Sequence, residues 1–299
     1  MLSNYYRLII LFCVLIACSK NQESDINTLR QTIENRFNEQ SGQFALAFID
    51  LQDNQQIMIN ENQRFHAAST MKTPVMIEAF KQAKSASINL DDSILLHNQF
   101  KSIVDGSEYS MDISDDSDDD LYKQIGTRKT IRDLIHDMIT KSSNLATNIL
   151  IDLLDAKKVT QTMREMGADS ILVLRGVEDI KAYRLGMNNT ITALDLALIF
   201  KQLALGKALD EQSSKEMIRI LMDQQHRDVI PLLLPDDVKV ANKTGWITGL
   251  QHDSALIFLP DGRRYVLVLC AAEMNEFDEG KRLLAEISKL IYDYMMKKL

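Results

Sequence analysis

Hydrophobic residues recur at helical spacing near both ends of the chain. From residue 26 to 38 they fall every three or four positions, which predicts an amphipathic helix, and a second such pattern predicts a final helix over residues 278–297. The segments 43–50 and 55–60 are apolar or alternating, and Asp53-Asn54 between them has turn chemistry. We therefore expect a strand hairpin directly after the first helix.

Helical patterns dominate the middle of the chain, and strand patterns return near its end. The helical patterns lie between about residues 73 and 202 and are clearest at 130–140, 143–154 and 192–205. The strand-like runs are 238–241, 253–259 and 265–271, and Pro260-Asp261-Gly262 is a turn between the last two. Sparse chain breakers favour long helices, and the sequence holds only 11 Gly and 4 Pro in 299 residues.

This order of elements predicts an α+β fold of the α/β-sandwich type. The two ends of the chain would share one antiparallel sheet of about five strands, flanked by the terminal helices, with an all-helical domain inserted between them. We expect residues 25–67 and 203–299 to build the sheet domain and residues 68–202 the helical domain. Active sites commonly lie in the cleft between two such units.

Composition and charge narrow the class of protein. The chain is 45% hydrophobic and 25% charged, as is ordinary for a globular protein. Its net charge of −8 at pH 7 argues against a broad nucleic-acid-binding surface. Nothing in the sequence indicates an oligomer, so we expect a monomer.

Residues 1–17 have the pattern of a signal peptide for export. Arg7 precedes an apolar run, Leu8 to Ala17, which is too short to span a bilayer as a helix. The run ends directly before Cys18, which resembles a bacterial lipoprotein signal whose cysteine carries the lipid and becomes the new N-terminus. A plain signal peptide with an incidental cysteine is the alternative. We expect the protein to be exported to the cell envelope or periplasm. Residues 18–24 would tether it to a membrane there, with the lipid as its only membrane contact.

The remaining cysteines predict no disulfide. Cys13 lies in the segment that would be removed, and Cys270 lies in the apolar run YVLVLCAA. A single thiol in such a strand is expected to be a small, buried core residue.

One segment is strongly acidic, with six Asp in the nine residues from Asp112 to Asp120. Asp116, Asp118 and Asp120 imitate the start of a calcium-binding loop, but the glycine and the distal glutamate of an EF-hand are missing. We therefore expect a solvated and mobile acidic loop rather than a metal site.

Three short motifs carry residues that could perform chemistry. The first is Ser69-Thr70-Met71-Lys72, an S-x-x-K motif, in which a helix would place the serine hydroxyl and the lysine amine on one face. A serine hydroxyl is a poor nucleophile until a neighbouring base takes its proton, and a desolvated lysine can be that base. A chain of this length holds about one S-x-x-K by chance, so the motif alone decides nothing.

The second and third motifs lie further along the chain. Ser142 and Asn144 form an S-x-N motif at the start of a predicted helix, where such residues also serve as caps. Lys243, Thr244 and Gly245 form a K-T-G motif at the end of a strand-like run. The lysine supplies positive charge, the threonine a hydroxyl donor, and the glycine room for a substrate close to the strand. Each motif alone also fits a purely structural role.

Together and in this order, the motifs resemble the active site of penicillin-recognising serine enzymes, in particular the class A β-lactamases. The resemblance extends from about residue 27 to 299, and the stretch ITKSSNLATNILI is similar to the corresponding helix of that family. It implies an enzyme that forms an acyl-serine intermediate with a β-lactam or a peptidoglycan peptide, without a metal or an organic cofactor. Zinc hydrolases and Ser-His-Asp esterases are disfavoured, because the sequence has no H-x-x-x-H, H-x-H or G-x-S-x-G motif.

The resemblance also implies roles for individual residues in acylation. Ser69 would attack the amide carbonyl, with Lys72 or, through a water, Glu178 as the base. The backbone N–H groups of Ser69 and Trp246 would bind the oxyanion. Ser142 would relay the proton to the leaving nitrogen.

Substrate binding would fall to the other motif residues. Lys243 would hold the relay serine in place and attract the substrate carboxylate, and Thr244 would donate a hydrogen bond to that carboxylate. Gly245 would let the substrate approach the strand. Asn144 would hydrogen-bond the side-chain amide of the substrate.

A glutamate that activates the deacylating water distinguishes class A enzymes within the family. Glu178 lies 34 residues after Asn144, a spacing that matches these enzymes, although a loop carboxylate facing solvent is the alternative. The family usually has Pro directly after this glutamate and Asn four residues on, where this chain has Asp179 and Ala182. The residues therefore support acylation more fully than deacylation, and slow turnover or an altered substrate could follow.

Outside the motifs, Arg175 and His66 have supporting interpretations, and no role is assigned to His252 and Asp253. Arg175 could form the ion pair that pins such a loop, but Asn189 stands where its acidic partner would be expected. We interpret His66 as structural, because the mechanism already has its acid and base. His252-Asp253 follows the K-T-G strand and is expected in a turn.

Three functions fit these observations. The first is a serine β-lactamase that hydrolyses the lactam and releases it, which Glu178 favours. The second is a peptidoglycan peptidase or transpeptidase of the same fold that releases penicillin slowly, for which Ala182 leaves room. The third is a non-catalytic envelope lipoprotein that uses the fold for binding. The intact serine and lysine motif residues argue against it.

Overall fold

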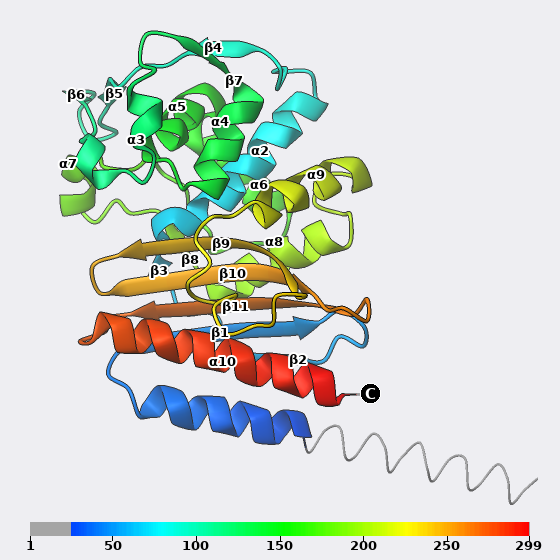
Figure 1. Ribbon diagram of the computed structural model, residues 1–299. Coiled ribbons are helices and arrows are strands. Elements are labelled where there is room, and N and C mark those ends of the chain that lie inside the picture. Colours follow the sequence, from blue (N-terminus) through cyan, green and yellow to red (C-terminus); the bar gives the residue numbers. More distant parts are fainter. Residues whose placement is uncertain (1–24, 299) are drawn as a thin grey trace, which may run out of the picture.

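The computed structural model describes residues 25–298, and the predicted signal segment with Cys18 lies outside the described residues (Figure 1). The α+β prediction is confirmed. One antiparallel five-stranded sheet, in the order β2-β1-β11-β10-β9, has helices on both faces. In this range, none of the helices combines the length and hydrophobicity that crossing a bilayer requires.

The two ends of the chain build the sheet together. The strands are β1 (Gln43–Asp50), β2 (Gln56–Ile59), β9 (Lys239–Ile247), β10 (Leu250–Phe258) and β11 (Arg264–Ala272). β1 pairs with β11, with Leu46 opposite Leu269, and this pairing joins the N-terminal hairpin to the three C-terminal strands. β9 is longer than predicted and contains the K-T-G motif, because these polar residues continue the pairing with β10.

The terminal helices flank the sheet, as predicted, and both cover the same face. The helix over residues 25–38 and α10 (Phe277–Lys297) lie on the same side of the strands (Figure 1). Ile33 and Phe37 of the first helix share a buried cluster with Leu267 of β11 and with Leu284 and Ile287 of α10. The apolar stripes of both amphipathic patterns are therefore what attach these helices to the sheet.

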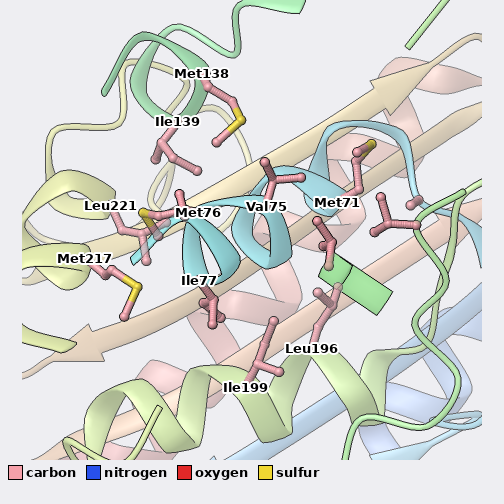
Figure 2. Packing of buried hydrophobic residues seen from close by; sticks show 14 of the residues in the cluster. Met71, Val75, Met76, Ile77, Met138, Ile139, Leu196, Ile199, Met217 and Leu221 are labelled. Atoms are coloured by element: carbon pink, nitrogen blue, oxygen red, sulfur yellow. The ribbon is translucent and has the colours of Figure 1, made fainter. Parts of the chain in front are cut away.

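The other face of the sheet carries the helical half of the molecule. Its longer helices are α2 (Lys72–Lys84), α4 (Ile131–Thr140), α5 (Asn144–Leu154), α6 (Ala156–Glu165), α8 (Ala193–Ala204) and α9 (Glu211–Met222). α2 is buried along most of its length. Figure 2 shows its Met76 and Ile77 among Met138 of α4, Leu196 of α8 and Met217 of α9. A helix that is enclosed on all sides gives the S-x-x-K motif a rigid support.

The remaining elements are short. They are β3 (Phe65–His66), η1 (Ala68–Met71), β4 (Ser93–Leu95), β5 (Phe100–Lys101), β6 (Glu108–Tyr109), η2 (Ile113–Asp115), α3 (Asp119–Tyr122), β7 (Arg128–Thr130), α7 (Ile180–Arg184) and β8 (Thr190–Ile191). α8 packs against β1, β10 and β11, and the boundary that we predicted between residues 202 and 203 falls within it. Cys270 is buried in β11 as a free thiol, as predicted.

The acidic segment differs from the expectation. Asp116 accepts hydrogen bonds from the backbone N–H groups of Asn144 and Leu145, at 2.9 and 2.8 Å. Asp118 is 4% exposed and pairs with Lys141 at 3.1 Å. The prediction of a solvated, mobile loop is therefore wrong at these two aspartates, because the free N–H groups that begin α5 bind one of them. Across residues 25–298 there is no group of three or more His, Cys, Asp or Glu side chains that could hold a metal ion.

Candidate active site

The S-x-x-K motif spans a junction between two helices. Ser69 lies in the 3₁₀ helix η1, and Lys72 is the first residue of α2. Ala68, directly before the serine, has φ of 42°, in the left-handed region that residues with a Cβ rarely adopt. Ser69 is partly exposed, so its hydroxyl lies in a tight turn at the end of a rigid helix.

Lys72 is fully buried, and its side-chain amine hydrogen-bonds to the serine and the asparagine of the S-x-N motif. Its Nζ donates to Ser142 O at 2.6 Å, to Ser142 Oγ at 3.2 Å and to Asn144 Oδ1 at 2.9 Å. Within the described residues it makes no hydrogen bond to Ser69 Oγ, which the helical spacing had suggested. Burial lowers the pKa of Lys72 to about 7, against the opposing charges of Asp116 and Glu178.

A second buried lysine approaches the same serine. Lys243 Nζ donates to Ser142 Oγ at 3.0 Å and to Thr244 O at 2.9 Å. Burial, and secondarily the charge of Lys72, hold the pKa of Lys243 well below its usual range. Ser142 has φ of 62°, and its hydroxyl lies between the two amines. Because each amine bonds to this oxygen, a proton can pass to or from it on either side.

The K-T-G motif brings the edge strand β9 against the nucleophile turn. A Cβ atom on Gly245 would lie 2.9 Å from Ser69 N and 2.8 Å from Thr70 N, closer than real Cβ contacts. Only glycine therefore lets the strand approach these amides. Thr244 is buried, and the Trp246 side chain is 61% exposed.

Asn144 connects the lysine to the predicted glutamate. Its Nδ2 donates to Glu178 Oε1 at 2.9 Å and to Asp115 O at 3.2 Å, while its Oδ1 accepts from Lys72. Burial raises the pKa of Glu178 to about 7. The hydrogen bond from Asn144 acts against this rise, and the nearby Asp116 adds to it. The structure thus brings Lys72, Ser142, Asn144, Glu178 and Lys243 into one hydrogen-bonded chain.

Asp179, which sequence reasoning noted only as a departure from the family, anchors the segment that carries Glu178. Its carboxylate accepts from Ser102 Oγ and from Ile103 N, both at 2.9 Å, and caps α7 by accepting from Ala182 N at 3.1 Å. Glu178 itself has φ of 62°. The available signal was an aspartate directly before a short helical segment, which is a preferred cap.

Arg175 forms no ion pair within residues 25–298. Its guanidinium donates to Met187 O at 3.0 Å, to Gly176 O at 2.9 Å and to Asn188 Oδ1 at 3.3 Å. Asn189 Oδ1 accepts from the backbone N–H of Arg175 at 3.2 Å. Hydrogen bonds from the guanidinium to neutral oxygen acceptors therefore hold this loop, where the family resemblance suggests a carboxylate partner.

His252 lies in a strand rather than in the predicted turn, and Asp253 lies in the strand predicted over residues 253–259. His252 and Asp253 belong to β10, because the turn after β9 ends at Gly249 and pairing resumes at Leu250. His252 lies opposite Gly245 in the sheet. Asp253 is buried and accepts from Asn242 Nδ2 at 3.1 Å and from Ile230 N at 3.0 Å.

The sequence matches the β-lactamase enzyme family over residues 28–295. The chain belongs to this family. It is 24% identical to β-lactamase CARB-3 of Pseudomonas aeruginosa over 245 residues, which cover 80% of this chain and 78% of that protein. It is 26% identical to β-lactamase CTX-M-97 of Escherichia coli over 282 residues, covering 93% and 92%.

Solved structures support the fold assignment. A leucine-to-glutamate variant of PBP-A, in an acyl-enzyme complex with penicillin G, superimposes with a TM-score of 0.77 at 23% identity, covering 91% of this chain and 97% of that one. A β-lactamase from Chitinophaga pinensis gives 0.76 at 22% identity, covering 89% and 98%. At these identities the likeness shows the fold alone, and it is equally good for PBP-A and for a β-lactamase.

Proposed function

We propose that this protein of the β-lactamase family is a serine β-lactamase that works through an acyl-serine intermediate and a glutamate-activated water. One observation carries the proposal: Asn144 bonds to Lys72 on one side and to Glu178 on the other, both at 2.9 Å. The candidate base for acylation and the candidate base for deacylation thus share one amide.

In acylation, Ser69 Oγ attacks the lactam carbonyl and forms a tetrahedral intermediate. Lys72, or Glu178 through a water, accepts the hydroxyl proton, and a pKa of about 7 for both groups suits transfer at neutral pH. The backbone N–H groups of Ser69 and Trp246 stabilise the oxyanion. The close approach of Gly245 to Ser69 N supports this assignment, because it brings β9 to the serine amide.

Collapse of the intermediate breaks the C–N bond, and Ser142 Oγ passes a proton to the leaving nitrogen. The hydrogen bonds from both buried lysines to this oxygen support the relay. Lys243 and Thr244 bind the substrate carboxylate, whose charge raises the pKa of Lys243 and favours its protonated form. Asn144 hydrogen-bonds the side-chain amide of the substrate.

In deacylation, Glu178 takes a proton from the water that attacks the acyl ester of Ser69. A half-buried carboxyl group with a pKa of about 7 is suited to this role as a general base. Ala182 is buried and offers no polar group at the position where the family usually has a water-holding asparagine. This observation favours a second candidate, a peptidoglycan peptidase or transpeptidase that penicillin acylates and leaves slowly.

We also propose that the protein is exported and lipid-anchored to a membrane of the cell envelope through Cys18. The apolar run that ends at this cysteine supports the assignment. The intact mass of protein purified from membranes, compared with the mass of Cys18→Ser, reports the lipid directly. An unmodified mature chain would contradict the anchor.

The test of the enzyme assignment is a time course of intact mass at pH 7 with excess penicillin G. We expect the wild-type protein to show a transient adduct on Ser69 while the drug is consumed. Glu178→Gln should accumulate the adduct, because an amide keeps the shape of the side chain but accepts no proton from water. Glu165→Gln, on the exposed face of α6, is the matched control and should behave as the wild type.

The other outcomes separate the alternatives. An adduct that persists in the wild-type protein makes the wall-peptide enzyme the better assignment. Turnover that is unchanged in Glu178→Gln removes Glu178 from the mechanism. The absence of any adduct leaves a non-catalytic envelope protein.

A further inference from the structure

The backbone directly before the nucleophile depends on a histidine side chain. His66, the last residue of β3, accepts a hydrogen bond at Nδ1 from the backbone N–H of Ala68, at 3.0 Å. Ala68 has φ of 42°, and its strained conformation sets the direction of the next amide, that of Ser69. A strained residue of this kind persists only where its surroundings fix it, and this hydrogen bond is one such constraint.

A second histidine fixes the first to the sheet. His252 Nε2 donates to the backbone carbonyl of His66 at 3.0 Å, and His252 lies opposite Gly245 in the pairing of β10 with β9. Two connections thus join the sheet to the nucleophile turn. One is the close approach of Gly245, and the other runs from His252 through His66 to Ala68.

The direction of the bond to Ala68 requires a neutral ring. A backbone N–H can only donate, so Nδ1 of His66 carries no proton and the neutral tautomer has its proton on Nε2. In the imidazolium form, two N–H groups would face each other and the Ala68 amide would lose its acceptor.

The surroundings of the ring favour the neutral form. Burial, and then the positive charge of Arg175, lower the pKa of His66. The ring of Tyr183 from α7 packs edge-on against the imidazole, with centroids 6.0 Å apart. His252, whose pKa burial lowers to about 4, brings no positive charge at neutral pH.

We propose that neutral His66 is a positioning residue, which holds the turn before Ser69 in the geometry for acylation and releases it when the ring gains a proton. The role in acylation rests on the proposed function, whereas the hydrogen bond itself does not. Ser69 remains the catalytic residue, because His66 acts on it only through the Ala68 amide.

Two variants separate the effect of the hydrogen-bond acceptor at position 66 from the effect of the aromatic ring. His66→Asn places Oδ1 where Nδ1 stands, so it can accept from the Ala68 amide two residues on without titrating. His66→Phe keeps an aromatic ring beside Tyr183 but has no acceptor. The measurements are the rate constant of acylation by penicillin G from pH 5 to 8, and the amide shift of ¹⁵N-labelled Ala68 over the same range.

We expect His66→Asn to be acylated within about threefold of the wild-type rate at pH 7.5. The acylation rate of His66→Phe should fall roughly tenfold or more, since misplacing one oxyanion donor costs up to 10²–10³-fold in rate. All three proteins keep the pH dependence that Lys72 and Glu178 impose. The additional loss of rate in acid should be present only in the wild-type protein, where the Ala68 amide shift follows the His66 titration. An equal loss in His66→Asn, or an Ala68 amide that ignores the titration, overturns the proposal.

The two measurements also distinguish this inference from the function on which it rests. If penicillin acylates none of the proteins, the proposed function fails, and the role of His66 in acylation fails with it. The Ala68 titration needs no substrate. The titration therefore tests the hydrogen bond between His66 and Ala68 whether or not penicillin acylates the protein.

Discussion

At the scale of single residues, Gly245 lets β9 approach the backbone amides of the nucleophile turn. We predict that Gly245→Ala lowers the acylation rate by roughly 10²-fold, because the new Cβ would press on the backbone amides of Ser69 and Thr70 and move an oxyanion donor. Overpacking of this kind also destabilises the fold by about 1–3 kcal/mol. Stopped-flow acylation and thermal unfolding measure the two effects.

A matched glycine controls for the added methyl group. In Gly280→Ala, on α10, the Cβ would meet the flexible side chain of Met274 rather than backbone. Its acylation rate should equal that of the wild-type protein, whatever happens to its stability. Wild-type acylation in Gly245→Ala would mean that the strand does not shape the oxyanion site.

The motif residues could be identified from the sequence because they lie close together along the chain. Their hydrogen-bond partners in the folded protein could not be identified in this way. The motifs identified Ser69, Lys72 and Lys243, but the helical spacing suggested that Lys72 meets Ser69, and the amine bonds to Ser142 and Asn144 instead. These bonds join positions 70 or more residues apart, and the folded helices decide them. Local pattern carries no information about such pairings.

At the scale of elements, Asp179 joins the Glu178 segment to the hairpin of β5 and β6 through Ser102 and Ile103. We predict that Asp179→Ala lengthens the lifetime of the acyl-enzyme more than it slows acylation, because Lys72 is a second candidate base for acylation, whereas Glu178 is the only candidate base for deacylation. Losing the cap and the buried acceptor should also destabilise the fold by about 1–3 kcal/mol. Acyl-enzyme decay and the acylation rate, measured on the same protein, separate the two steps.

A second link between the same segments supplies the control. Asp105 and Lys181 form an exposed ion pair at 2.9 Å. Exposed pairs contribute little, so Asp105→Ala should leave acyl-enzyme decay at the wild-type rate and change stability far less than Asp179→Ala does. Equal effects of the two substitutions would show that Asp179 has no special role.

Periodicity predicted the elements well and their ends less well. The terminal helices and the strands β10 and β11 follow from apolar stripes that the sheet buries. β9 extends beyond its apolar run into Lys243-Thr244-Gly245, since hydrogen bonding to β10 continues where hydrophobicity stops. The acidic segment differs from its prediction for a related reason. Its charge indicated solvent, but the N-terminus of α5 binds Asp116.

At the scale of the whole molecule, the site buries two lysines where the sheet meets the helical half. Burial is the main cause that lowers the pKa of both Lys72 and Lys243, so the unfolded chain holds more protons than the folded one at pH values between the folded pKa and 10.5. Stability must then rise with pH in that window, by up to about 1.4 kcal/mol per pH unit for each lysine.

The acidic groups do not cancel this trend above neutrality. Burial raises the pKa of Glu178 and of Asp253 to about 7. The stability that they contribute is present in acid, below their unfolded pKa values, and is lost as the pH rises through 7. Burial also raises the pKa of the Cys270 thiol above its usual 9.0, and this group opposes the trend only near and above that pH. The lysines therefore dominate between about pH 7.5 and 9.

We accordingly predict that the free energy of unfolding in urea increases from pH 7.5 to 9, and that Lys72→Met has a smaller slope. Lys215→Met removes an exposed lysine and should keep the wild-type slope. A flat profile in the wild-type protein, or an unchanged slope in Lys72→Met, would contradict the account. The expected result means that folding is coupled to the release of a proton from Lys72. Burial in the folded protein favours the neutral form of Lys72, which is one of the two candidate bases for acylation.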